Sequence, residues 1–214
     1  MFTDRQDAGR RLATRLEEYR GKKAIVIGLP RGGVVVAHEI AKELGLPLDV
    51  IITRKIGAPG NPEYAIGAVA ETSDVQLNEA EIQAYGIPSR YVDDEIKRQK
   101  TEIERRVQLY RDGRRLPSVK NKTVILVDDG IATGFTMRAS VRAIRTQNPR
   151  EIILAVPVAP PEVVDDFQRE VDRMICLATP SPFFAVGAWY RHFEQTTDEE
   201  VKSYLADAGY PSRG

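Results

Sequence analysis

The sequence lacks the features typical of secreted, membrane-spanning or nucleic-acid-binding proteins, namely paired cysteines, long apolar runs and excess positive charge. Among its 214 residues there is one cysteine, Cys176, which excludes an intrachain disulfide framework or a cysteine-based metal cluster. No apolar run approaches the roughly 20 residues that a membrane-spanning helix needs, and the charged start of the chain is unlike a signal peptide. Basic and acidic residues balance at 31 each, so no global positive field favours nucleic acid or a membrane surface. These absences predict a cytoplasmic protein.

What is present predicts an α/β fold. The apolar content of 42% and the charged content of 29% are ordinary for a globular protein, and the length suits one domain over residues 1–214. Short apolar runs alternate with helical periodicity, which predicts a central parallel sheet with helices on both faces. The expected strands are 24–27, 48–53, 124–127, 152–157 and 174–178, and the expected helices are 3–20, 34–44, 136–148, 162–170 and 198–208.

Two segments interrupt this alternation. Residues 64–71 and 75–77 predict a hairpin after a breaker-rich stretch, 57–62. Residues 78–115 predict a helical insertion, with a short helix at 78–84 and a long charged helix at 89–111. A charge-rich helix is usually a solvated face, but the partial apolar stripe of the long helix could instead pack on a sister subunit in a homodimer.

Residues 123–136 form the most informative stretch. A near-unbroken apolar run ends at Val127, as in a strand buried on both faces, and is followed by Asp128 and Asp129. The next residues are small or carry hydroxyls and precede a helix, so their amides can seat a phosphate. The two carboxylates cannot hold phosphate but suit sugar hydroxyls or magnesium. Together these groups predict a site for a phosphorylated ribose. The plainer alternative is a buried strand with an acidic turn and a capped helix.

This stretch resembles the phosphoribosyl pyrophosphate (PRPP) motif of type I phosphoribosyltransferases. The resemblance implies that Asp128 and Asp129 bind the ribose 2′ and 3′ hydroxyls, with Mg²⁺ held directly or through water. It also implies that the following loop binds the 5′-phosphate, through Gly130, Ile131, Ala132, Thr133, Gly134, Phe135 and Thr136.

A second loop, residues 28–33, follows the strand expected at 24–27. Its glycines permit close approach to a ligand, and Arg31 supplies a guanidinium suited to phosphate. By resemblance this loop binds pyrophosphate through Pro30, Arg31, Gly32 and Gly33, with a strained or cis peptide between Leu29 and Gly32. Arg54 and Lys55 are expected at the end of strand 48–53, where Lys55 would act catalytically by stabilising the departing pyrophosphate. A plain turn and a solvated basic pair are the alternatives.

The irregular aromatic segment 179–195 is similar in position to the small hood that selects the nucleobase in this family. Flat rings can stack on a base, so the candidates are Phe183, Trp189 and Tyr190. The alternative is that these rings fill a small core.

The resemblance implies transfer of the phosphoribosyl group of Mg-PRPP to a nitrogen nucleophile, a nucleobase in most of the family, with release of pyrophosphate. Members that use 6-oxopurines carry aspartate where this chain has Ala132, so the acceptor remains open. Two other functions stay open as well. One is a non-catalytic PRPP-sensing regulator of the same fold, and the other is a scaffold that binds without turnover.

Overall fold

The computed structural model describes residues 1–72 and 74–209. The chain forms two compact units, each made of segments that are distant in sequence. The first contains Met1–Val50, Leu116–Thr133 and Gln147–Gly214, and the second contains Ile51–Arg115 and Gly134–Thr146.

The first unit is built on a five-stranded parallel sheet, as the sequence predicts. The strands β1 (Ala24–Gly28), β2 (Leu48–Val50), β6 (Thr123–Val127), β7 (Glu151–Val158) and β8 (Arg173–Ala178) are arranged in the order β2-β1-β6-β7-β8. In β6 all five residues are buried, which explains its continuous apolar sequence. Each fully buried Val, Ile or Leu side chain contributes about 1.5–3 kcal/mol relative to an exposed one.

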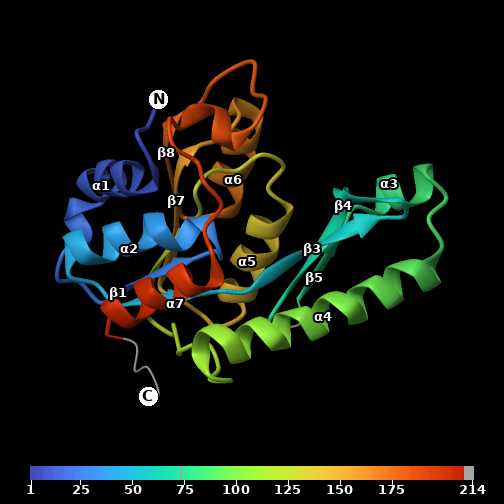
Figure 1. Ribbon diagram of the computed structural model, residues 1–214, viewed down its shortest axis with the longest axis horizontal. Coiled ribbons are helices and arrows are strands. Elements are labelled where there is room, and N and C mark those ends of the chain that lie inside the picture. Colours follow the sequence, from blue (N-terminus) through green and yellow to red (C-terminus); the bar gives the residue numbers. More distant parts are fainter. Residues whose placement is uncertain (73, 210–214) are drawn as a thin grey trace. The chain divides into compact units, whose positions relative to one another are not determined.

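Helices cover both faces of this sheet (Figure 1). Helix α2 (Gly32–Leu44) joins β1 to β2, and α6 (Pro161–Glu170) joins β7 to β8 in the opposite direction across the sheet. Because parallel crossovers are right-handed, the two helices lie on opposite faces. Helix α1 (Arg5–Arg15), extended by the 3₁₀ helix η1 (Glu17–Tyr19), packs on α2. The 3₁₀ helix η2 (Val186–Trp189) and helix α7 (Asp198–Asp207) complete the unit.

The strand order reverses between β1 and β6. The chain leaves β1 toward β2 on one side and leaves β6 toward β7 on the other, and the two strands are paired with Gly28 opposite Val127. In open α/β sheets, ligands bind at the carboxyl ends of the strands where the order reverses. The loops after β1 and β6 are the two predicted phosphate-binding loops.

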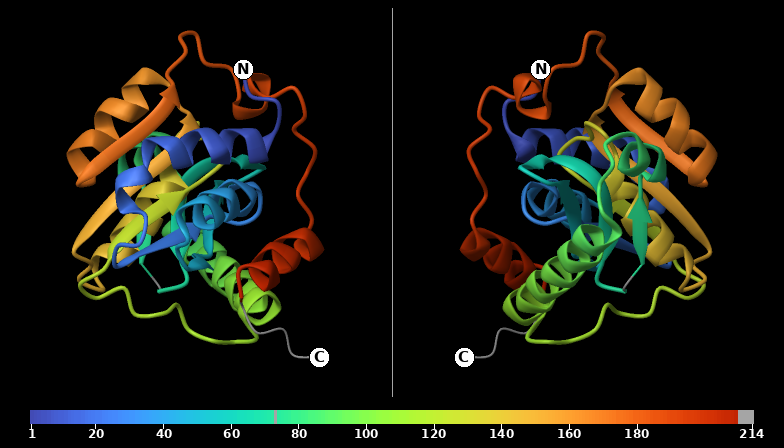
Figure 2. Two further views of the ribbon diagram at one scale, coloured as in Figure 1. Left: turned by 90° about the vertical axis from the view of Figure 1, so that its left-hand side faces the viewer. Right: turned by 90° about the vertical axis from the view of Figure 1, so that its right-hand side faces the viewer.

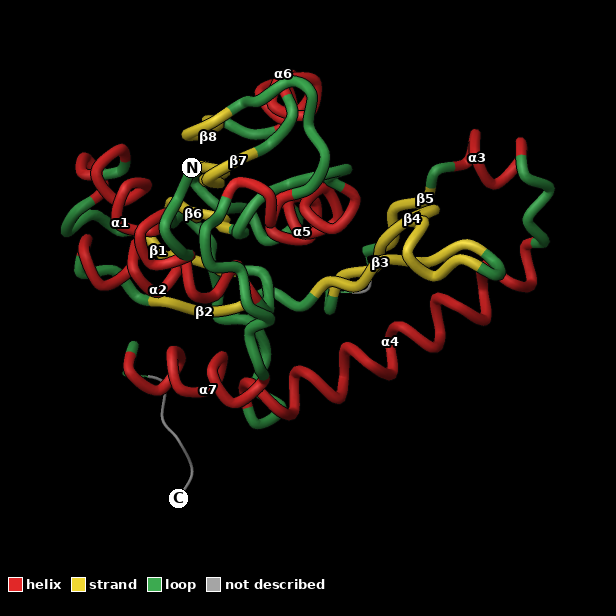
Figure 3. The backbone as a smooth tube through the Cα atoms, turned by 45° about the horizontal axis from the view of Figure 1, so that its top comes forward, coloured by secondary structure: helices red, strands yellow, loops and turns green. Residues whose placement is uncertain are grey.

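The second unit contains the predicted hairpin. Its antiparallel strands are β3 (Thr53–Ala58), β4 (Asn61–Ala70) and β5 (Val75–Leu77), in that order, so β3 is a strand that the sequence analysis missed (Figure 3). The predicted helical insertion is present as α3 (Glu79–Ala84) and α4 (Ser89–Arg111), and the unit also includes α5 (Phe135–Arg145). Ile56, Ile66 and Val92 form the buried centre between the hairpin and α4.

The apolar stripe of α4 is only partly covered by its own chain. Val92, Ile103 and Tyr110 are each 5% exposed or less, whereas Ile96 and Val107 are partly exposed. The homodimer therefore stays a prediction. Across the described residues, no helix has both the length and the apolar character needed to cross a bilayer.

One expected strand is wrong. The apolar run 48–53 reads as a single strand ending at Arg54 and Lys55, but β2 ends at Val50 and both cations lie inside β3. The peptide N–H of Ile52 donates to Oε1 of Glu71 at 2.9 Å, a bond to a side chain 19 residues away. The chain therefore leaves the parallel sheet before Arg54.

Candidate active site at the carboxyl ends of β1 and β6

The two predicted acids follow β6 directly. Oδ1 of Asp128 accepts a hydrogen bond from the backbone N–H of Asp129 at 2.8 Å, which fixes the turn at the strand end. Gly130 follows beneath η2, where an added Cβ would lie 2.5 Å from Cγ1 of Val186. Ile131 is buried, and its N–H donates to the carbonyl of Val158 at 2.9 Å. The start of the loop is thus held in place by neighbouring strand and hood residues.

The loop after β1 lies against these acids. The N–H of Leu29 donates to the carbonyl of Val127 at 2.9 Å, and the peptide between Pro30 and Arg31 is cis, within the predicted interval. A Cβ at Gly33 would lie 2.8 Å from Cα of Asp128, and one at Gly32 would overlap the Asp129 carboxylate. The two predicted loops are therefore in direct contact, and glycine is required where they touch.

Arg31 is placed differently from the two glycines. Its side chain is 30% exposed, and Nη1 lies 3.9 Å from Oδ1 of Asp198, the first residue of α7. Arg31 belongs to the same unit as the acids, but its guanidinium is paired with a carboxylate of α7.

Burial makes the acid pair costly to ionise. Burial raises the pKa of Asp128 well above its usual value, and the neighbouring charge of Asp129 raises it further. Burial also raises the pKa of Asp129, but Arg5 opposes this effect. Nε of Arg5 donates to Oδ2 of Asp129 at 2.8 Å, and the two side chains are 11% and 16% exposed. The site therefore holds two carboxylates and one permanent cation.

Arg5 is a site residue that the sequence analysis missed. Helix α1 begins after Asp4, whose Oδ1 accepts from the N–H of Asp7 at 2.7 Å, and this start places Arg5 in the first turn. Its guanidinium also donates to the carbonyl of Glu194 at 2.8 Å and lies 3.9 Å from the ring centre of Phe193. Arg5 therefore links the acids to the hood segment. Nothing local in sequence marks it, because its partners are more than 120 residues away.

The hood is attached to the acid loop through Tyr190. Its hydroxyl donates to the carbonyl of Asp129 at 2.6 Å, and its ring packs on those of Phe2 and Phe193, with centroids 5.4 and 4.9 Å away. Tyr190 is only 6% exposed, so its ring is a core element and not an open stacking surface. Phe183 and Trp189, the other two base-binding candidates, are partly buried around the same cluster.

The N-terminal segment runs beside this hood. The N–H of Phe2 donates to the carbonyl of Trp189 at 2.8 Å, and the N–H of Arg191 donates to the carbonyl of Phe2 at 2.9 Å. Figure 2 shows the N-terminus next to the short helix η2. The aromatic segment is thus held by backbone pairing as well as by its rings.

The predicted 5′-phosphate loop passes from the first unit to the second between Thr133 and Gly134. In the first unit Ala132 and Thr133 are exposed. In the second unit Gly134 has φ of 82° and starts α5, and among the described residues no side chain caps this end of the helix. Phe135 and Thr136 open the helix. Free N–H groups at a helix start of this kind are in general suited to an anion.

Arg54 and Lys55 lie on opposite faces of the hairpin, because neighbouring strand residues alternate. Nε of Arg54 donates to Oε1 of Gln99 on α4 at 3.0 Å. Thr53, on the same face as Lys55, has its Oγ1 2.7 Å from Oγ of Ser140 on α5. Lys55 therefore lies on the face of β3 that contacts α5, the helix after the predicted phosphate loop, whereas Arg54 faces α4.

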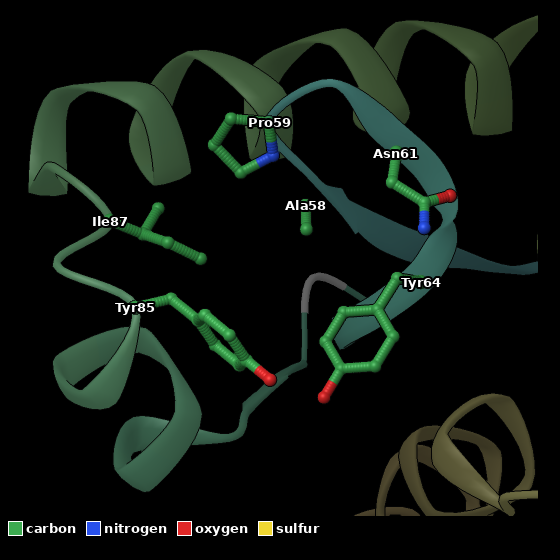
Figure 4. Close-up of a pocket in the computed structure, with 6 residues that line it drawn as sticks. All are labelled: Ala58, Pro59, Asn61, Tyr64, Tyr85 and Ile87. Atoms are coloured by element: carbon green, nitrogen blue, oxygen red, sulfur yellow. The ribbon is translucent and has the colours of Figure 1, made fainter.

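A separate cavity of about 410 Å³ lies near the tip of the hairpin in the second unit (Figure 4). The rings of Tyr64 and Tyr85 meet there edge to face, with centroids 6.0 Å apart. The cavity is lined by Ala58, Pro59, Asn61, Tyr64, Tyr85 and Ile87. No residue predicted for the site is among them.

The first unit thus defines an α/β protein with a candidate ligand site where the strand order reverses. Comparison with known proteins identifies the class more closely, because a family model described as a phosphoribosyl transferase domain matches residues 3–190. The chain belongs to the phosphoribosyl transferase domain family, which confirms the resemblance drawn from residues 124–136.

Individual relatives agree with this assignment. A Mycobacterium tuberculosis protein, provisionally named a phosphoribosyl transferase, is 43% identical over 205 residues, which are 96% of this chain and 46% of that protein. The chain therefore spans about half the length of this relative. A crystal structure from Thermus thermophilus is 41% identical with a TM-score of 0.80, covering 97% of this chain and 98% of that one. A Neisseria gonorrhoeae structure with bound ppGpp shares the fold alone, at 14% identity, a TM-score of 0.50 and 98% coverage of both chains.

Proposed function

We propose that this chain transfers the 5-phosphoribosyl group of Mg-PRPP to a nitrogen nucleophile. In this reaction a bond forms between the nucleophile and C1 of the ribose while the bond from C1 to the pyrophosphate oxygen breaks. The main support is the contact of Gly32 and Gly33 with Asp129 and Asp128, which brings the predicted pyrophosphate and ribose loops together.

The acids bind the sugar in this proposal. Ionised Asp128 and Asp129 accept hydrogen bonds from the ribose hydroxyls, and they are also suitable oxygen ligands, directly or through water, for Mg²⁺ that shares its shell with substrate phosphates. When bound, magnesium supplies positive charge to the pyrophosphate oxygens. Arg5 balances part of the charge of the buried pair and orients Asp129.

The remaining groups bind the two phosphate ends. Backbone amides along residues 130–136 hold the 5′-phosphate, and the loop at Pro30, Arg31, Gly32 and Gly33 holds the pyrophosphate. Lys55 neutralises charge that develops on the leaving group. Arg54, also predicted for the pyrophosphate, faces α4 and bonds to Gln99. The chemistry needs positioning, charge neutralisation and exclusion of water more than it needs a covalent nucleophile.

The acceptor would lie under the hood. Of the three rings predicted to bind it, Phe183 and Trp189 are partly exposed, while Tyr190 positions the hood on the acid loop. Ala132 leaves the identity of the acceptor open. We propose a nitrogenous acceptor, a nucleobase being the first to test.

The test is release of pyrophosphate from Mg-PRPP across a panel of purine and pyrimidine bases and other nitrogen nucleophiles. We expect release that depends on one acceptor and on magnesium. Release with none of them, together with retained PRPP binding, would identify a PRPP-binding regulator instead.

A further inference from the structure

Arginine side chains gather in a second cavity, on the face of the hairpin opposite Lys55. This arginine cavity has a volume of about 580 Å³ and lies between β3 and α4, within the second unit. It is lined by Arg54, Arg98, Gln99, Thr101, Glu102 and Arg105. Its size is within the range of roughly 300–1,000 Å³ typical of small-molecule sites.

The carboxylates around the cavity are already engaged by arginines. Glu102 accepts two hydrogen bonds from Arg105, at 2.8 and 3.0 Å, and one from Arg106 at 2.8 Å. Glu95 accepts two from Arg98, at 2.8 and 2.7 Å. Glu102 and Glu95 are thus already bonded to arginines of α4.

Arg54 adds a further positive charge to this group. Its guanidinium donates to the neutral amide oxygen of Gln99, and Gln99, which is 7% exposed, donates to Oε1 of Glu95 at 2.7 Å. Burial lowers the pKa of Arg54, and the neighbouring charges of Arg106, Arg98 and Arg105 lower it further, against the opposing effect of Glu102. The cavity therefore carries an excess of positive charge around a partly buried guanidinium.

We infer that the arginine cavity binds a small polyanion that carries phosphate groups. Guanidinium groups present parallel N–H donors that match phosphate oxygens, and charge-assisted bonds of this kind are the stronger ones. An anion here would relieve the mutual repulsion of the arginines and could bond to the Thr101 hydroxyl, which lines the same cavity.

The geometry favours a small molecule over nucleic acid. The cavity is bounded by one strand and one helix, and α4 also exposes Asp93, Asp94 and Glu104, which would repel an extended phosphate backbone. The whole chain carries no net charge. The inference does not depend on the proposed transferase activity, because Arg54 and Lys55 lie on opposite faces of β3.

Isothermal titration of the full chain with inorganic tripolyphosphate tests the inference. The informative variant replaces both Arg98→Ala and Arg105→Ala, because these side chains are 67% and 54% exposed and their removal should leave the fold intact. The matched control is Arg90→Ala on the same helix, where the side chain is 94% exposed and outside the cavity. We expect one tripolyphosphate site to weaken about tenfold or more in the double variant and to be unchanged in the control.

Circular dichroism and the melting temperature should confirm that both variants remain folded. Arg98→Lys with Arg105→Lys should bind with intermediate affinity, because charge is kept while the paired donors are lost. Unchanged binding in the alanine double variant, equal loss in Arg90→Ala, or absence of tripolyphosphate binding would overturn the inference. Tighter binding of a single-stranded oligonucleotide with the same arginine dependence would overturn the small-molecule assignment. None of these outcomes requires measurable pyrophosphate release.

Discussion

The guanidinium of Arg5 bonds to the carboxylate of Asp129, through Nε and Oδ2 at 2.8 Å, although 124 residues separate them. A cation from the first turn of α1 thus contacts one member of the acid pair that follows β6. Burial raises the pKa of both acids, and Arg5 acts against this for Asp129. The position of α1 therefore affects how readily the pair can ionise.

Replacing Arg5→Ala should move the pH dependence of Mg-PRPP binding toward higher pH. The ligand needs ionised carboxylates, so affinity falls as pH drops through the raised pKa of the pair. Without the cation the pKa of Asp129 rises further, and the fall begins at a higher pH. Titration of PRPP affinity against pH measures the midpoint. Arg15→Ala, at the exposed end of α1, is the control, and an identical midpoint in all three proteins would contradict a role for Arg5.

Replacing Asp128→Asn together with Asp129→Asn should remove the thermal stabilisation by Mg-PRPP. A ligand present at 100 times its Kd stabilises a protein by about 2.7 kcal/mol, which corresponds to roughly 5–10 °C for a chain of this size. Thermal melts with and without Mg-PRPP measure this shift. Asp93→Asn with Asp94→Asn, on the exposed side of α4, should keep it. A shift that survives in the first variant would count against the ribose assignment.

The unliganded protein should lose less stability with rising pH when Asp128→Asn is introduced. A buried acid with a raised pKa binds more protons folded than unfolded, so its contribution to stability falls as pH rises from its ordinary value of 3.8 through the raised value. The amide does not titrate. Urea unfolding from pH 4 to pH 8 gives the free energy of unfolding of the variant and of the wild type. If the difference between the two does not change with pH, the pKa of Asp128 is not raised by folding.

Lys55→Ala should reduce kcat more than it weakens PRPP binding. If Lys55 acts on the charge that develops on pyrophosphate, its loss should cost roughly a hundredfold in kcat. Steady-state kinetics combined with direct PRPP binding separate the two effects. Lys97→Ala, whose side chain is 77% exposed on α4, is the control. Equal losses in turnover and affinity would show that Lys55 only binds the ground state.

Tyr190→Phe should destabilise the first unit by about 1–3 kcal/mol, because the carbonyl of Asp129 loses a buried hydrogen bond at 2.6 Å. Urea unfolding measures this cost. Tyr85→Phe, at a ring that is 69% exposed, should have little effect. Equal stability of both variants would mean that the hydroxyl does not hold the hood to the acid loop.

Sequence reasoning predicted the contiguous features of the candidate site. The strand β6 followed by Asp128 and Asp129 was predicted from local pattern, and the cis peptide found at Pro30–Arg31 was expected from the family resemblance. Distant contacts were not available to it. Arg5 bonds to the carboxylate of Asp129, which is far away in sequence. The hydroxyl of Tyr190 donates to the backbone carbonyl of the same residue, 61 positions earlier.

The misplaced strand has the same cause. Residues 48–53 are apolar enough for one strand, yet Glu71 binds the N–H of Ile52 and the pairing with β1 stops at Val50. Arg54 and Lys55 were therefore expected at a sheet edge and are found on two faces of a hairpin. Had β3 been predicted as a strand, the alternation of side chains between its two faces would have placed Arg54 and Lys55 on opposite sides.

Arg54 and Lys55 are consecutive residues of β3, with Cα atoms about 3.8 Å apart. One peptide unit therefore separates the arginine that lines the cavity from the lysine proposed to act on the leaving group. A change in the backbone torsions of Arg54 would reorient the next residue, Lys55.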